Sequence, residues 1–499
     1  MTSALALQLA VTAAISLTSP EMERRAVHHL TEQFERVGRA APVIDEGLTR
    51  AARALAEEAL QTSAKEAANV LSVSQAVSDA EGYDPSPRAL VIRGSPPDQA
   101  LASFLARTDA SHEPASRMGI GAAIRGESGA LVALLATRKV TLKSFPRLVK
   151  PGNSPRLCGE LSGSFRAADV FVTLPNGDVD KPTVSLEGPR FCAKIGFPIA
   201  GRYSIEVVGL GAQGPEVAAL FFADAGSSAH REGRAHLVEP ASVVEARSAI
   251  LARINALRKA HHLVPIEFDD GLDSVAQKYS EQMATQGFFA HVAPDGSDLR
   301  GRLQKAGYGY RVAGENLGLA PGPIAAHFGI EQSPGHLRNL IDPRYTRLGL
   351  GIAYQRGDER PQAIVTEIFT EPNVGPADPL QAAYRSLQEK RAELKLPALQ
   401  RSGILEAIAL EHAKRALELD QPRPQLPGVP LDEKVFAAVK DIRTTTVDVF
   451  VSESPRKITD SKSLEDRRND RVGVGAVKGD STTYGKNKYW VVVIYASPK

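Results

Sequence analysis

The sequence predicts a multidomain α+β protein in which one α/β unit occurs three times, with a small β-sandwich between the first and second copies. Two observations predict the repeat: a helix, a proline-marked turn and a second amphipathic helix recur, and each recurrence ends in apolar strands opened by Gly-x-Gly. A third observation predicts the sandwich, because one stretch holds only short alternating strand patterns between turn signals.

Chain length and charge set the first limits. At 499 residues the chain is too long for one hydrophobic core, and about three or four domains are expected. Lys and Arg number 60 against 58 Asp and Glu, so no net charge draws the chain to nucleic acid or anionic lipid. Aromatic residues make up only 6%, with the single tryptophan Trp490, so platforms for base stacking are not expected.

The N-terminus predicts export. Ala4 to Leu17 is an uncharged, largely apolar run followed by Thr18-Ser19-Pro20, which is typical of a signal peptide over residues 1–18 and too short for a membrane span. No Lys or Arg precedes the run, so a buried first helix remains the alternative. No other segment is long and apolar enough to span a membrane. We expect a secreted, periplasmic or cell-surface protein, in which Cys158 and Cys192 form a disulfide.

The first half of the repeat is a pair of helices around a proline turn. In the second copy Leu257–Pro265 leads into Gly271-Leu272, and in the third Lys390–Pro397 leads into Gly403-Ile404. The step from proline to glycine is six residues in both. The first copy runs from Pro42 to Gly47-Leu48 with a step of five, and each second helix continues with apolar residues at helical spacing.

The second half is a glycine-marked strand pair. The opening motifs are Met118–Gly121, Leu348–Gly351 and Val472–Gly475, and the first glycine of each lies 77, 84 or 76 residues after its turn proline. Glycine at alternate strand positions fits a close approach of backbones. A generic α/β hairpin would explain one copy but not three. The predicted units cover residues 21–143, 243–372 and 380–499.

Residues 150–226 lack helical periodicity. Alternating runs such as Val170–Leu174 and Tyr203–Val208 are separated by Pro-Asn-Gly-Asp and Ala-Gly turn signals. This pattern predicts a small Ig-like β-sandwich whose strands the two cysteines tie together. Residues 227–242 and 373–382 are expected to be linkers.

The middle copy alone carries a concentration of polar motifs, which are Gly287–His291, Pro294–Gly296, Gly314–Asn316 and Ser333–Asn339. In this order the motifs resemble the CAP superfamily, which includes cysteine-rich secretory proteins, antigen 5 and plant pathogenesis-related proteins. The similarity is to its bacterial SCP-like branch and covers the whole middle unit. The flanking units resemble the fold only in their first helices and last strands, and are interpreted as degenerate copies.

The resemblance implies an α-β-α sandwich with a groove lined by histidines and acidic residues. It places His291 as the first cavity histidine, Glu315 as the glutamate of Gly-Glu-Asn and His336 as the second histidine. Two neutral imidazoles and a carboxylate are a sufficient set for a divalent metal such as zinc. The same three groups could form a His–Glu acid/base pair around a water, and any catalysis would rest on them.

The sequence departs from the animal and plant pattern at a second glutamate. Ser333 stands where their Trp-x-x-Glu motif has the glutamate, and Ile330 stands at the tryptophan. Ser333 would line the cavity as a weaker metal ligand, while Glu331, one helical step away, should point elsewhere. Asn316, Gly335 and Asn339 are expected to be structural, fixing turns and the helix junction.

The flanking copies lack these groups. The C-terminal copy reads Ser454-Pro455-Arg456-Lys457, which is interpreted as lysine in place of the second histidine, and His112 in the N-terminal copy is interpreted as a solvated loop residue. The first functional hypothesis is a protein that binds a small molecule, a cell-surface polymer or a partner protein in its cavity. The alternative is a metal- or His/Glu-assisted hydrolase of peptide or cell-wall material, and a third reading treats the cavity as vestigial. Binding is favoured over catalysis, because the sequence contains neither a nucleophile elbow nor His-Glu-x-x-His.

Overall fold

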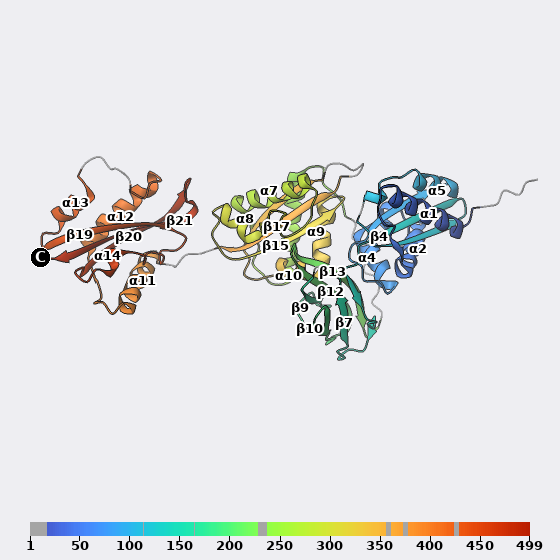
Figure 1. Ribbon diagram of the computed structural model, residues 1–499, viewed down its shortest axis with the longest axis horizontal. Coiled ribbons are helices and arrows are strands. Elements are labelled where there is room, and N and C mark those ends of the chain that lie inside the picture. The colour runs from blue at the N-terminus through green and yellow to red at the C-terminus, as the bar shows by residue number, and fades with distance from the viewer. Residues whose placement is uncertain are drawn as a thin grey trace, which may run out of the picture.

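Three α/β units and one all-β domain make up the chain, as the computed structural model shows (Figure 1). The structure describes residues 17–112, 114–163, 165–227, 237–355, 361–372, 378–423 and 429–499. The apolar run predicted as a signal peptide therefore lies, apart from Leu17, outside the described residues. None of the helices in these ranges is long and apolar enough to cross a membrane.

The N-terminal unit spans residues 19–136. Its elements are α1 (Ser19–Arg36), β1 (Val43–Ile44), α2 (Glu46–Gln61), α3 (Ala64–Ala67), α4 (Val70–Asp79), β2 (Arg88–Gly94), α5 (Pro97–Leu105), the 3-10 helix η1 (Ala110–His112), β3 (Arg117–Arg125) and β4 (Ser128–Ala136). The sheet order is β1-β3-β4-β2, with β1 parallel to β3 and the other pairs antiparallel.

The middle unit spans residues 243–372. Its elements are α6 (Val243–Ala260), β14 (Glu267–Phe268), α7 (Asp270–Gln286), α8 (Leu299–Lys305), β15 (Tyr310–Ala320), α9 (Pro323–Gln332), α10 (Pro334–Leu340), β16 (Arg347–Tyr354) and β17 (Ala363–Pro372). The sheet order is β14-β16-β17-β15. Helix α7 packs on one face of the sheet, and α6 and α9 cover the other, which gives an α-β-α sandwich.

The C-terminal unit spans residues 379–498. Its elements are α11 (Pro379–Glu393), β18 (Gln400–Arg401), α12 (Gly403–Glu418), α13 (Leu431–Ala438), β19 (Ile442–Ser452), α14 (Lys462–Glu465), β20 (Arg471–Ser481) and β21 (Gly485–Pro498). The sheet order is β18-β20-β21-β19, which matches the order of the middle unit strand for strand. Helices α12 and α11 bury opposite faces of this sheet.

The Gly-x-Gly pairs explain how closely helix and sheet approach in all three units. A Cβ on Gly119 would lie 2.2 Å from the main-chain carbon of Leu48, and one on Gly349 would lie 2.4 Å from that of Leu272. On Gly473 the corresponding distance, to Leu405, is 2.3 Å. No side chain fits at such distances, so glycine is required for the second helix to sit against the sheet.

A buried arginine anchors the loops of the middle and C-terminal units in the same way. Arg258 and Arg391 each donate from Nε to the carbonyl six residues ahead and from the other guanidinium nitrogens to three carbonyls of a distant loop. The acceptors are Val264, Leu340, Asp342 and Tyr345 for Arg258, and Pro397, Leu464, Asp466 and Asn469 for Arg391. The two units therefore share interior packing as well as strand order.

The β-sandwich consists of two mainly antiparallel sheets. Its strands are β5 (Val140–Leu142), β6 (Leu148–Val149), β7 (Arg156–Leu161), β8 (Ala167–Thr173), β9 (Val179–Asp180), β10 (Val184–Glu187), β11 (Arg190–Lys194), β12 (Gly201–Gly211) and β13 (Gly214–Ala225), in the orders β10-β11-β7-β5 and β6-β13-β12-β8-β9. A disulfide joins Cys158 and Cys192, which lie opposite each other on β7 and β11.

One predicted boundary differs from the structure. Strand β5 pairs with β7, so residues 140–142 belong to the sandwich rather than to a unit ending at residue 143. The sandwich therefore starts about ten residues earlier than the predicted boundary of 150. A three-residue strand carries too short an alternation to be assigned from the sequence to one domain or the other.

The sandwich touches both of its neighbours. The hydroxyl of Ser78, on α4, accepts a hydrogen bond from Phe222 N at 2.9 Å, and Arg202 donates to Gln75. On the other side the backbone N–H of Val292 donates to Gln213 O at 3.1 Å. Figure 1 shows β12 and β13 (green) running up between the N-terminal and middle units.

Candidate functional site

His291 is the first residue of the candidate site. Helix α7 ends at Gln286 and is capped by Gly287, whose φ of 68° is left-handed. The hydroxyl of Tyr279 holds the following segment by donating to Ala290 O at 2.6 Å. The His291 side chain is 18% exposed, and its Nδ1 lies 2.9 Å from Oε1 of Glu315. The contact with Glu315 fixes the imidazole through Nδ1, and Nε2 lies on the opposite side of the ring.

Glu315 is held between that histidine and a cation. It lies on β15 opposite Ile368 of β17 and is almost wholly buried. Its second oxygen, Oε2, accepts a hydrogen bond from Nη2 of Arg302 on α8. The Arg302 guanidinium lies 3.4 Å above the ring of Tyr279. Both oxygens of the buried carboxylate are thus engaged, and its charge is compensated.

His336 faces His291 from the opposite side. Ser333 caps α10, and its Oγ lies 2.7 Å from His336 Nδ1. The two imidazole rings stack with centroids 6.5 Å apart and an interplanar angle of 28°. Burial, and secondly the neighbouring His291, lower the pKa of His336 to about 3, so His336 is neutral at physiological pH. The structure thus brings together all four predicted cavity residues.

The fit of a metal ion depends on which atoms remain for coordination. Each Glu315 oxygen already takes part in one contact, Oε1 with His291 Nδ1 and Oε2 with Arg302 Nη2. In the described part of the chain no group of three or more His, Cys, Asp or Glu side chains is placed to hold a metal ion. The residues predicted as a three-ligand set therefore do not form a preorganised metal-binding group among the described residues. Zinc binding by His291, Glu315 and His336 stays a prediction.

Two asparagines connect the cavity residues through the backbone. Asn316 donates to His336 O at 3.2 Å, and Asn339 donates to Glu315 O at 3.3 Å and to Asn316 Oδ1 at 2.9 Å. Side-chain amides of this kind satisfy carbonyls that would otherwise be left unpaired in the interior. The contacts support the structural role predicted for both residues.

A third histidine, His327, lies in a buried ionic cluster that the motifs did not indicate. Its Nδ1 lies 2.6 Å from Oε1 of Glu367, and its Nε2 lies 3.0 Å from Oε1 of Glu331. These carboxylates outweigh desolvation and raise the pKa of His327 to about 9. Glu331 also pairs with Arg253, so it points away from the cavity, as expected.

The sandwich supplies the second residue that sequence reasoning missed. Glu206 on β12 is wholly buried and accepts hydrogen bonds from Ser333 Oγ at 2.6 Å and from Gly335 N at 2.7 Å. In the alternation Tyr203–Val208 it occupies a polar, outward position. It does point out of the sandwich, but the middle unit covers it, and a period of two cannot reveal such an interface.

A hollow of about 270 Å³ lies beside His291, between the sandwich and the middle unit. It is lined by Ala212, Gln213, Phe288, Val292, Ala293, Pro294 and Gly296. Its position at a domain boundary and its mainly apolar lining are usual for ligand sites, and its volume of about 270 Å³ lies just below their usual range of about 300–1,000 Å³.

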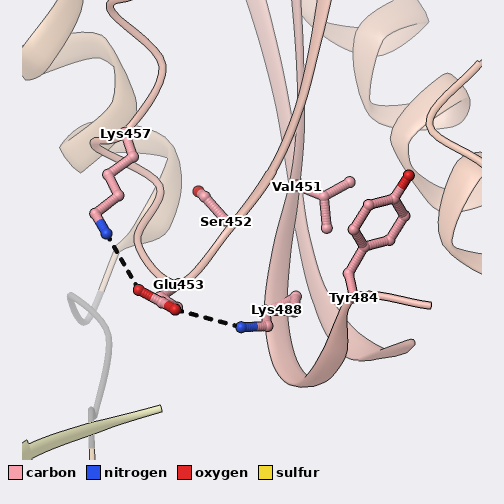
Figure 2. A pocket seen from close by; sticks show the side chains of 6 residues that line it. All are labelled: Val451, Ser452, Glu453, Lys457, Tyr484 and Lys488. Atoms are coloured by element: carbon pink, nitrogen blue, oxygen red, sulfur yellow. Dashed lines mark hydrogen bonds and ion pairs between the residues drawn. The ribbon is translucent and has the colours of Figure 1, made fainter. Parts of the chain in front are cut away.

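A hollow of about 240 Å³ in the C-terminal unit has different chemistry (Figure 2). Glu453 lies between the ammonium groups of Lys457 and Lys488, at 3.1 and 3.5 Å, and Val451, Ser452 and Tyr484 complete the lining. In the middle unit Arg258 Nη1 donates to the carbonyl of Leu340, and in the C-terminal unit Arg391 Nη1 donates to the carbonyl of Leu464. The interpretation that Lys457 takes the place of the second histidine in this unit stays a prediction.

Comparisons with known proteins bear on the middle unit. Residues 251–369 match the family model of the cysteine-rich secretory protein family, CAP. Among curated proteins, the chain is 31% identical over 130 residues to the membrane protein YlbC of Bacillus subtilis, covering 24% of this chain and 37% of that protein. It is 28% identical over 115 residues to YkwD of the same species, covering 22% and 44%. The chain thus spans less than half the length of these relatives.

Solved structures with similarity include an outer surface protein of Borrelia burgdorferi, with 20% identity, a TM-score of 0.24, and coverage of 27% of this chain and 99% of that one. An extracellular SCP-domain protein of Bacillus anthracis has 18% identity, a TM-score of 0.22, and coverage of 44% and 67%. The family-model match confirms the resemblance drawn from the four motifs. The middle unit of this chain is a CAP domain.

Proposed function

We propose that this protein is an extracytoplasmic CAP-domain protein that binds a small ligand, a cell-surface polymer or a partner protein in the cavity of His291, Glu315, Ser333 and His336. The stacked pair of imidazoles carries the proposal, because each ring is fixed through Nδ1 by a neighbour and keeps Nε2 for a ligand. The disulfide between Cys158 and Cys192 supports a location in an oxidising compartment.

The polar groups of the cavity favour recognition over turnover. Both oxygens of the Glu315 carboxylate are directed at partners within the protein, His291 and Arg302, rather than at a substrate. His336 is neutral and held by Ser333. Two fixed imidazoles next to a mainly apolar hollow suit a ligand that carries hydroxyl or amide groups, as glycans and peptides do.

Binding of soluble peptidoglycan fragments to the full chain, measured by calorimetry, tests the proposal. The double variant His291→Ala/His336→Ala should lose binding, because it removes both free imidazole nitrogens. The matched control is His262→Ala at an exposed position of the same domain, which should bind as the wild type does. Equal affinity in the double variant and the control would overturn the proposed cavity, and no saturable binding in the wild type would exclude peptidoglycan fragments as its ligand.

The alternative function is hydrolysis, and the 2.9 Å contact between His291 and Glu315 favours it to the extent that a carboxylate orients an imidazole base. Glu315→Gln should then abolish turnover of peptide or cell-wall substrates. Zinc at the imidazole pair is tested by thermal shift with Zn²⁺ alone, since a bound metal stabilises by mass action. A shift that survives in His291→Ala/His336→Ala would exclude these ligands.

We further propose that the flanking units are degenerate copies of the CAP fold with architectural or partner-binding roles. Their common strand order, their glycine pairs and the Arg391 anchor support this proposal. In the CAP sheet, register leads from Gly349 through Ile368 to Glu315. The same path ends at Ala89 in the N-terminal unit and at Val447 in the C-terminal unit, so neither has the cavity carboxylate.

A further inference from the structure

We propose that Glu206 of the β-sandwich is a positioning residue of the CAP cavity, which acts through the Ser333 hydroxyl to fix the tautomer of His336. The site is then built by two domains, and the sandwich is a part of it rather than a spacer. The inference rests on the proposed function only in taking His336 to be a residue that faces the ligand.

The placement of Glu206 is unusual for a carboxylate. It lies in the middle of β12, between Phe171 of β8 and Leu220 of β13, and is wholly buried. Within the described residues it forms no ion pair, and its partners are the hydroxyl of Ser333 and the N–H of Gly335. Burial without a cation raises the pKa of Glu206 to about 7. A buried acid of this kind persists where its hydrogen bonds are satisfied.

The seat of Glu206 is shaped to receive it. A Cβ on Gly335 would lie 2.7 Å from Glu206 Oε2, so any other residue at position 335 would displace the carboxylate. At a second contact between the sandwich and the middle unit, a Cβ on Gly214 would lie 2.8 Å from the Cβ of His291. The sandwich therefore approaches both cavity histidines, one through Glu206 and the other through the β12–β13 turn.

The direction of the hydrogen bonds follows from proton counting. A serine hydroxyl carries one proton, and an ionised carboxylate can only accept. Above pH 7, where Glu206 is ionised, Ser333 must therefore donate to Glu206, which leaves Oγ as an acceptor toward His336 Nδ1. His336 is neutral, so a proton on Nδ1 leaves Nε2 with a lone pair.

This tautomer decides which ligand groups the cavity accepts. Nε2 of His336 has no hydrogen-bond partner among the described residues, and its ring stacks on His291. With a lone pair, Nε2 accepts a hydrogen bond from a hydroxyl or amide, whereas with a proton it would require an acceptor. Ionised Glu206 thus selects ligands that present a donor at this position.

Glu206→Gln reverses the hydrogen bonds with little change in shape. The glutamine oxygen can still accept from Gly335 N, and its NH₂ then donates to Ser333 Oγ. Ser333 must in turn donate to His336 Nδ1, which moves the histidine proton to Nε2. The matched control is Glu216→Gln on β13, whose carboxylate is exposed and pairs with Lys139.

Long-range ¹H–¹⁵N spectra of the full chain, labelled at histidine nitrogen and recorded without ligand at pH 8.5, test the inference. The His336 signals are assigned by their loss in His336→Gln. Wild type and Glu216→Gln should show protonated Nδ1 and unprotonated Nε2, and Glu206→Gln should show the two exchanged.

Protonated Nε2 in the wild type would overturn the inference without any variant, as would an unchanged tautomer in a folded Glu206→Gln protein. Because no ligand is present, this result is independent of the peptidoglycan-binding test. Failure of binding with the expected tautomers would refute the proposed function alone.

Discussion

The buried cluster around His327 allows the sharpest prediction about stability. His327, Glu367 and the side chain of Glu331 have little or no contact with solvent, and Arg253 and Asn316 complete the cluster. His327→Val leaves the carboxylate of Glu367 with Asn316 as its remaining partner. Adding Glu367→Gln removes that uncompensated charge and keeps an acceptor for Asn316.

The stability that protonated His327 contributes follows from its pKa, which rises from 6.5 to about 9. At about 1.4 kcal/mol per pKa unit, the protonated form contributes about 3 kcal/mol. Because the folded pKa is the higher one, this stability is complete below pH 6.5 and is lost as the pH rises through 9. His327→Val should therefore destabilise the CAP domain by about 3–5 kcal/mol at pH 6, and the double variant by much less.

Tryptophan fluorescence would report on the C-terminal unit rather than on the CAP domain, because Trp490 is buried in the C-terminal sheet. Native-state hydrogen exchange of the peptide covering β17 reports the CAP domain directly. A loss of about 3 kcal/mol speeds its exchange on the order of a hundredfold at pH 6. If the single and double variants exchange equally fast, the ionic interpretation of the cluster is refuted.

Three further predictions concern the other units and the sandwich. Arg258→Ala and Arg391→Ala should each lower the stability of their own unit by about 3–5 kcal/mol, because each leaves four carbonyls without their donor. Hydrogen exchange in the respective unit measures this loss, and an effect in one unit only would argue against a common anchor. Gly351→Ala should destabilise by at least about 1–3 kcal/mol in the same assay, since its Cβ would lie 2.2 Å from Ala276 O; a neutral result would contradict the packing. Because the pKa of Glu206 is raised to about 7, its protonated form contributes stability that is complete below pH 4.5 and lost as the pH rises through about 7. The free energy of unfolding of Glu206→Gln should therefore gain about 3 kcal/mol on that of the wild type between pH 4.5 and 8. His336 destabilises the wild type and Glu206→Gln alike in acid. Profiles of stability against pH that run parallel in the two proteins would refute this prediction.

The sequence predicted the parts of the fold that rest on periodicity and close approach. The glycine pairs at 119, 349 and 473 mark where helix meets sheet, and the structure shows that no side chain fits there. The four motifs of the middle unit were sufficient to identify the CAP domain, and the match to the family model confirms it.

The remainder depends on contacts between segments distant in sequence. Arg302 lies among other basic residues of α8, and nothing in its local pattern distinguishes it as the partner of Glu315. His327 and Glu367 are 40 residues apart and become a pair only in the folded domain. Glu206 follows the alternation of an ordinary exposed strand position, and the domain that covers it begins further along the chain.

A histidine-resolved NMR titration of the full chain with soluble peptidoglycan fragments tests the cavity most directly. The ring-proton signals of His291 and His336 should shift together and saturate at one ligand concentration, because the stacked rings share one site. The signal of exposed His262 should stay in place. Saturable binding that leaves His291 and His336 unmoved would contradict a ligand site at this pair.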